Sequence, residues 1–125
     1  MPVISIKSLP LENDVNIPEI LKKLNTETAK AIGYETRHIW SYWEFLAPHH
    51  YSVGENTSDK TTNEGYSPIV NVISFEGKPK EHIENMLKTI ARVLSSELKI
   101  DIGNIFITYT EASSGRVFDG SNIVY

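Results

Sequence analysis

Four short stretches of the chain carry the apolar and aromatic residues, partly in alternation with polar ones, that are typical of β-strands. They cover residues 2–9, 37–46, 68–75 and 105–111. Between the first and second stretch, apolar residues recur at helical spacing from Ile17 to Ile32. Between the third and fourth they do so from Ile83 to Leu98. The pattern therefore predicts strand, helix and strand, twice over.

The ends of the predicted helices carry recognisable signals. Asn16 is a suitable N-cap for the first helix, with Pro18 in the first turn and Glu19 at the capping-box position. Gly33 suits the left-handed residue that follows a helix. In the second half, Gly77-Lys78-Pro79 predicts a turn into a helix with proline near its start.

The two halves of the chain repeat one another residue by residue. Pro2-Val-Ile-Ser-Ile matches Pro68-Ile-Val-Asn-Val, and Glu44 near the end of the second strand stretch matches Glu111 at the end of the fourth. A helix of this length joins parallel strands, and the connection is expected to be right-handed. Each half is therefore predicted to be one β-α-β unit.

Together the halves predict an α+β fold, in which two tandem β-α-β units form a four-stranded mixed sheet with both helices on one face. We expect a single domain over residues 1–125, with pseudo-repeats at 2–46 and 68–111. The other face of the sheet carries isoleucine and aromatic side chains that no element of the chain covers. We expect further copies of the chain to bury that face.

Composition narrows the class of protein. The chain has 125 residues, a net charge of −4, no cluster of Lys and Arg, and no cysteine. Disulfide scaffolds, thiol catalysis and cysteine metal sites are excluded, and nucleic acid is not an expected partner. Neither a signal segment nor a membrane-spanning run is recognisable, so we expect a cytoplasmic protein with no membrane partner.

The first residues carry the strongest candidate chemistry. Methionine before a small residue such as proline is normally removed, which would leave Pro2 with a free secondary amine. Burial and nearby cations lower the pKa of an amine, and a base near neutral pH could then result. The alternative is that Pro2 is only a rigid start to an edge strand. If Met1 is retained, Pro2 is in an amide and cannot act as a base.

Several stretches resemble the tautomerase superfamily. SPIVNVISFEGKPKEH is similar to the opening of 4-oxalocrotonate tautomerase, and NIFITYTEASSGRVF to the last strand and tail of macrophage migration inhibitory factor. HIWSYW resembles a strand of cis-3-chloroacrylic acid dehalogenase, and VIS with KPKE resembles malonate semialdehyde decarboxylase. The resemblance implies a homotrimer without cofactor or metal. It also implies Pro2 as the catalytic residue acting on a small carboxylic-acid substrate.

The same resemblance suggests which cations hold the substrate. Lys78 matches an arginine of 4-oxalocrotonate tautomerase, and Lys80 pairs with it in K-P-K. Either lysine would bind a carboxylate less selectively than an arginine, and both are equally well explained as surface residues at a helix start. Arg37 is a second candidate ligand, with a surface charge as the favoured alternative. Tyr34 stands where macrophage migration inhibitory factor has a lysine.

Strand alternation and the tail supply the remaining candidates. Ile105, Ile107 and Tyr109 are expected to face the helices, so Phe106 and Thr108 would face the trimer interior and the pocket. Asp119 falls near the acidic residue with which the dehalogenases activate water, although a turn-forming role before Gly120 is the favoured explanation.

Four histidines and one long loop have not yet been given a role. His49 and His50 lie in the polar stretch 47–66, which is long enough to be functional or mobile. Their spacing does not favour a metal site, and lining the pocket mouth is the other role considered. His38 and His82 are expected to be structural.

The leading hypothesis is a cofactor-independent isomerase that catalyses keto–enol tautomerisation of a small 2-keto or unsaturated carboxylic acid. Two alternatives stay open. One is a hydratase, dehalogenase or decarboxylase on the same scaffold, and the other is a trimeric binding protein with vestigial activity.

Overall fold

The structure is a computed structural model that describes residues 1–12, 14–62 and 65–125. The helices are α1 (Ile17–Ile32) and α2 (Lys80–Leu98), with short 3-10 turns η1 (Thr36–His38) and η2 (Ile102–Asn104). The main strands are β1 (Val3–Ser8), β2 (Trp40–Phe45), β5 (Ile69–Phe75) and β6 (Phe106–Ala112). Four two-residue strands complete the set: β3 (Ser52–Val53), β4 (Asn56–Thr57), β7 (Val117–Phe118) and β8 (Ile123–Val124).

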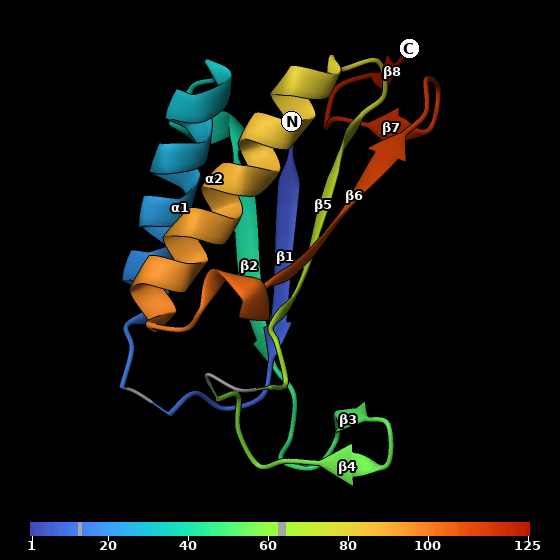
Figure 1. The fold of residues 1–125 in the computed structure, drawn as a ribbon. Coiled ribbons are helices and arrows are strands. Elements are labelled where there is room, and N and C mark those ends of the chain that lie inside the picture. The colour runs from blue at the N-terminus through green and yellow to red at the C-terminus, as the bar shows by residue number, and fades with distance from the viewer. Residues whose placement is uncertain (13, 63–64) are drawn as a thin grey trace.

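The main strands form one mixed sheet in the order β2-β1-β5-β6. Strand β1 pairs in parallel with β2, and β5 pairs in parallel with β6. The two halves meet where β1 and β5 run antiparallel. Both helices cover the same face of this sheet (Figure 1). The predicted fold class is therefore confirmed.

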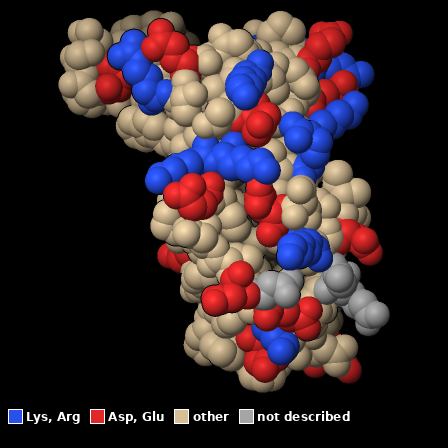
Figure 2. All heavy atoms as spheres, turned by 90° about the vertical axis from the view of Figure 1, so that its left-hand side faces the viewer, with Lys and Arg blue, Asp and Glu red and all other residues tan. Residues whose placement is uncertain are grey.

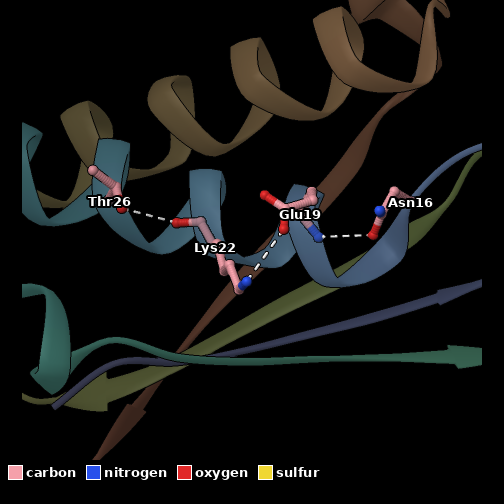
Figure 3. Close-up of polar contacts among 4 residues, drawn as sticks. All are labelled: Asn16, Glu19, Lys22 and Thr26. Carbon is pink, nitrogen blue, oxygen red and sulfur yellow. Dashed lines mark hydrogen bonds and ion pairs between the residues drawn. The ribbon is translucent and has the colours of Figure 1, made fainter.

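Helix α1 begins as its sequence predicts. The side chain of Asn16 accepts a hydrogen bond from the backbone N–H of Glu19 at 3.2 Å (Figure 3). The carboxylate of Glu19 binds Lys22 at 3.2 Å, so the capping interaction runs through Asn16. Gly33 ends the helix with a φ of 73°, a conformation that glycine adopts without the strain of a Cβ.

The core lies between the helices and one face of the sheet. Strand β1 contributes Ile4 and Ile6, and β5 contributes Val70 and Val72, all of them fully buried. Helix residues such as Leu24, Met86, Ile90 and Leu94 complete the same cluster. Burial of this apolar surface is the main force that holds the helices on the sheet.

The opposite face of the sheet consists of three rows set by the strand register. From the chain start outward the rows are Trp40, Val3, Ile73, Thr110; then Tyr42, Ser5, Asn71, Thr108; then Glu44, Lys7, Ile69, Phe106. Trp40 and Phe106 are more than half exposed in the isolated chain. As expected from alternation, Ile107 and Tyr109 pack instead against the core.

The structure corrects the start of the second strand. Residues 37–39 were expected to be extended, but Arg37 and His38 lie in the η1 turn and the strand begins at Trp40. The N–H groups of His38 and Ile39 donate to carbonyls three residues earlier, and this local turn displaces the strand pairing.

Two hairpins were missed in segments taken for loop and tail. Strands β3 and β4 pair across a turn that contains Gly54, whose φ is 60°, and β7 and β8 pair across a turn that contains Gly120, whose φ is 100°. Hairpin β3–β4 projects from the end of the sheet opposite the chain start (Figure 1). His49 binds Thr57 in this loop at 2.6 Å, and neither His49 nor His50 lines the cavity at the start of its own chain.

The surface of the helical layer mixes the two signs of charge. Figure 2 shows that Lys and Arg side chains alternate with Asp and Glu over this face. Among the described residues, no helix combines the length and apolar character needed to cross a membrane.

Candidate active site

The start of the chain lies beside a cavity of about 690 Å³ at one end of the sheet. Its walls come from β1, β2, β5, the segment after α1 and the tail hairpin. The apolar part of the lining consists of Met1, Val3, Trp40, Ile73, Phe75, Val117 and Phe118. The polar part includes Tyr34, His38, Ser74 and Asp119. A mostly apolar cleft with a few polar groups is the usual form of a small-molecule site.

The sheet register fixes the backbone at this cavity. Pro2 is buried, and its carbonyl accepts a hydrogen bond from the N–H of Trp40 at 3.1 Å. Val3 then pairs with Trp40 on one side and Ile73 on the other. The structure includes Met1, so the nitrogen of Pro2 is an amide here and the terminal amine is that of Met1.

Two features of this end of the sheet act on the terminal amine. Burial, followed by the positive charge of Lys78, lowers the pKa of the Met1 amine below its ordinary value of 8.0. Both effects come from the surroundings and not from the residue that carries the amine, since desolvation and a nearby cation each disfavour any charged amine at this position. The site therefore favours an uncharged nitrogen at the chain start.

Lys78 projects from the tight turn between β5 and α2. The turn contains Gly77, whose φ is 88° and whose N–H donates to the carboxylate of Glu111 at 3.3 Å. The ammonium of Lys78 lies 5.4 Å from the centre of the Tyr34 ring, within the range of a cation–π interaction. Within the described part of the chain, Lys78 has no ion pair, so its charge is available to an anion.

His82, in the first turn of α2, lies beside the same ring. The rings of His82 and Tyr34 are 5.6 Å apart and tilted by 52°. Burial, and then the charge of Lys78, lowers the pKa of His82 below 6.5, so the imidazole is neutral at pH 7. Its Nε2 atom is buried and has no hydrogen-bond partner among the described residues.

The structure separates Lys78 from the other predicted cations. Lys80 begins α2 with its side chain 82% exposed, and it pairs with Glu84 at 3.7 Å. Arg37 pairs with Glu35 at 2.6 Å and is 75% exposed. None of the three side chains, Lys78 included, is itself on the cavity wall. Only Lys78, of the three predicted carboxylate ligands, acts on the terminal amine.

Phe106 and Thr108 are not brought to the cavity of their own chain. They face away from the helices, as expected, but Phe106 lies in the row farthest from the chain start. Thr110, in the row nearest the chain start, is four positions further along β6 than Phe106, so the two residues are roughly 13 Å apart along the strand. The hydroxyl of Thr108 accepts a hydrogen bond from Asn71 at 2.7 Å.

Asp119 does reach the cavity. Its Oδ1 atom accepts hydrogen bonds from the N–H of Asn122 at 3.0 Å, the N–H of Ser121 at 3.0 Å and the Ser121 hydroxyl at 2.9 Å. These bonds lower the pKa of the carboxyl group, which is ionised at neutral pH. Asp119 thus combines the turn role with a place on the cavity wall.

Several lining residues were missed from the sequence. Tyr34 was read only as the loss of a cation, and His38 as structural, yet both line the cavity. Gly33 could have indicated Tyr34 and His38. It ends α1, and the residues after it lead into β2, which begins beside the start of β1. Phe118 was hidden because the tail showed no recognisable strand pattern.

Other clusters offer less chemistry. A second cavity of about 510 Å³ lies at the start of α1, but Lys22 and Lys23 in its wall already pair with Glu19 and Glu97. Within the described ranges, no group of three or more His, Asp or Glu side chains could hold a metal ion.

No protein-family model and no curated protein matches the sequence. Solved structures do match. A wild-type fused 4-OT, described as an asymmetric trimer, has a TM-score of 0.80 and 13% identity, with 97% of this chain and 94% of that chain covered. N1, a member of the cis-3-chloroacrylic acid dehalogenase (cis-CaaD) family, has a TM-score of 0.77 and 7% identity, with 98% and 83% covered.

A third match is the macrophage migration inhibitory factor-like protein of Entamoeba histolytica. Its TM-score is 0.68 and its identity 16%, with 94% of this chain and 95% of that chain covered. The chain therefore has the fold of these tautomerase-superfamily structures, and the resemblance inferred from the sequence is confirmed at the level of the fold.

Proposed function

We propose that the protein is a tautomerase-superfamily enzyme whose base is the nitrogen of Pro2 after Met1 is removed. Its reaction is keto–enol tautomerisation of a small 2-keto or unsaturated carboxylic acid, without a cofactor. The observation that carries the proposal is the placement of the chain start. It lies at an apolar cavity where burial and Lys78 both lower the pKa of the terminal amine.

The reaction needs a group that is unprotonated near neutral pH and reaches the substrate. An uncharged proline nitrogen accepts the proton of the enol hydroxyl, and the resulting ammonium returns a proton to carbon. A positioned base of this kind contributes typically about 10²–10⁴-fold in rate. Removal of Met1 creates the amine at Pro2, which is buried in the same surroundings.

Lys78 has two roles in this proposal. Its ammonium attracts the substrate carboxylate, and its charge keeps the proline nitrogen unprotonated. The apolar walls around Trp40 and Phe118 receive the rest of the substrate and exclude water. Lys80 and Arg37 have no part in binding, because each is already paired on the surface.

We also propose that three copies assemble around the exposed sheet face. Support comes from the exposed aromatic side chains there, including Trp40, Tyr42 and Phe106. A trimer is also what the fused 4-OT structure is described as. In this arrangement Phe106 and Thr108 serve the trimer interior.

The test is the conversion of enol to ketone in phenylpyruvate, measured on protein that intact mass shows to lack Met1. The proposal expects a rate well above that of buffer. A rate equal to buffer, with Met1 confirmed absent, would refute the tautomerase proposal and favour a binding protein or a different reaction.

A hydratase or dehalogenase is the second candidate, and Asp119 favours it. Its ionised carboxylate lines the cavity that the chain start also lines, so it could accept a proton from a water molecule. The probe is cis-3-chloroacrylate, with chloride release as the readout. Chloride release that Asp119→Asn abolishes would support this candidate, and no release from the unaltered chain would exclude it for this substrate.

A further inference from the structure

Lys78 carries the positive charge that acts on the chain start. Its ammonium lies over one of two contacting rings, those of Tyr34 and His82, which together are called the stack. The ammonium of Lys78 lies 5.4 Å from the centre of the Tyr34 ring, and the ring of His82 lies 5.6 Å from that of Tyr34. Among the described residues, other lysines, such as Lys80 and Lys23, pair with carboxylates. A ring attracts a cation without neutralising its charge.

The backbone on both sides of the stack is fixed. The N–H of Tyr34 donates to the carbonyl of Ala29 at 2.9 Å, directly after Gly33 ends α1. The turn that carries Lys78 is tied to β6, because Glu76 donates its N–H to the carbonyl of Ala112 at 3.0 Å and accepts from the N–H of Ser114 at 2.8 Å. The stack therefore joins the end of one helix to the turn before the other.

We infer that Tyr34 is a positioning residue, which holds the Lys78 ammonium beside the cavity and free to receive the carboxylate of a ligand. His82 contacts the same ring. This inference deepens the proposed function and rests on it for the identity of the ligand as a carboxylate.

The chemistry of the three side chains fits this role. A carboxylate near Lys78 would compete with the ligand, whereas the Tyr34 ring leaves the charge intact. A charged histidine beside the ring would repel Lys78, but His82 is neutral at pH 7. Lys78 itself is not on the cavity wall, but Tyr34 and Met1 both are, and the charge of Lys78 reaches the Met1 amine, so the cation lies beside that part of the wall.

The test compares two ligands of one shape that differ in charge. Binding of 3-phenylpropanoate and of 3-phenylpropanamide is measured by calorimetry on the chain without Met1, at pH 7.5. We expect the unaltered chain to bind the acid more tightly. Tyr34→Leu should weaken binding of the acid on the order of fivefold and leave binding of the amide unchanged, as loss of a cation–π contact predicts.

Two further variants separate positioning from packing. Tyr34→Phe keeps the ring and should restore most of the affinity for the acid. Lys78→Met should lose at least as much affinity for the acid as Tyr34→Leu does, and the double variant should lose no more than Lys78→Met, because Tyr34 acts on the acid only through Lys78. In turnover of phenylpyruvate, Tyr34→Leu should raise KM more than it lowers kcat.

Three results would overturn the inference. The first is that Tyr34→Leu weakens binding of the acid and of the amide equally. The second is that it does not weaken binding of the acid, and the third is that the unaltered chain binds the amide more tightly than the acid. If Tyr34→Leu fails to fold, NMR of the unaltered chain decides. An upfield ring-current shift of the Lys78 ε-methylene protons supports the contact, and its absence refutes it.

Failure of the proposed function gives a different pattern. A chain that binds 3-phenylpropanoate through Lys78 but leaves phenylpyruvate enol unconverted would refute the tautomerase, while the binding data would still support the role of Tyr34.

Discussion

Pro2 and Pro68 take matching places at the start of the two half-repeats, and the antiparallel pairing of β1 and β5 puts them at opposite ends of the sheet. Both prolines are buried. The Pro2 end holds the start of the chain and lies beside the cavity. Lys78 adds a positive charge there, and it has no acidic partner among the described residues.

The Pro68 end is closed by hydrogen bonds. Ser67, directly before it, accepts a bond from the hydroxyl of Tyr51 at 3.0 Å and donates one to Asn104 at 2.7 Å. Asn104 in turn donates to the carbonyl of Thr62 at 2.8 Å. The long segment 47–66, which follows the first half, supplies two of these residues.

The comparison shows what a repeated fold leaves free. Each half pairs its two strands in parallel and places one helix on the same face of the sheet, so the fold alone gives neither end a chemical advantage. A proline within the chain has no free amine. The differences lie in the chain start, the cation on the neighbouring turn, and the loop that ties down the opposite end.

The largest predicted effect comes from changing the two prolines separately. Pro2→Ala should lower phenylpyruvate tautomerisation by about 10²–10⁴-fold, because a secondary amine fixed by the proline ring is replaced by a freely rotating primary amine that is no longer positioned, with the assembly unchanged in gel filtration. Pro68→Ala is the matched control and should stay within about twofold of the unaltered chain, since it holds no amine and touches no part of the cavity. Wild-type activity in Pro2→Ala would disprove the proline base.

The two lysines of K-P-K provide the next contrast. Lys78→Met should raise KM by about tenfold, the scale of one exposed charge-assisted contact. Lys78 lowers the pKa of the amine, so its removal raises that pKa. The acid limb of the rate profile should then move to higher pH, because the base stays protonated over a wider range.

Lys80→Met is the control for that experiment. Lys80 pairs with Glu84 on the surface of α2, so its loss should leave both KM and the acid limb unchanged. Equal effects of the two substitutions would contradict the separation of the lysines that the structure describes.

At the closed end, Tyr51→Phe should act on stability alone. It removes the bond to the Ser67 carbonyl, so the free energy of unfolding in urea should fall by about 0.5–1.5 kcal/mol. Tautomerase activity should not change. A loss of activity larger than the loss of stability would mean that the two ends are coupled.

The smallest expected effect concerns acid stability at the open end. The pKa of His82 is lower in the folded chain than its ordinary value of 6.5, so the unfolded chain binds the proton more readily. Stability should therefore fall as the pH drops through and below 6.5. His82→Phe should reduce that fall between pH 7.5 and 5.5 in urea titrations, whereas His50→Phe, in the loop at the other end, should not.

Much of the fold could be predicted because local signals and the repeat agree. Asn16 and Gly33 bound α1 as expected, and the alternation in β6 correctly separated Ile107 from Phe106. The start of β2 was misplaced because the turn at Arg37 is held by backbone bonds that side-chain pattern does not encode.

The site was predicted less completely, because it depends on residues far apart in sequence. Pro2, Lys78 and Asp119 could be named from motifs, but Tyr34 and Phe118 join them only through the sheet and the tail hairpin. Lys78 and Lys80 look equivalent in sequence. They separate because one lies in the turn and the other begins a helix on the surface.

The most direct test is the pKa of the Pro2 nitrogen, measured by 15N NMR on protein without Met1. The peptide Pro-Val-Ile is the reference, since it has the same amine in water. The account predicts a lower pKa in the protein than in the peptide, and a rise toward the peptide value in Lys78→Met. A pKa equal to that of the peptide, or unaffected by Lys78→Met, would contradict the claim that this end of the sheet makes the chain start a base.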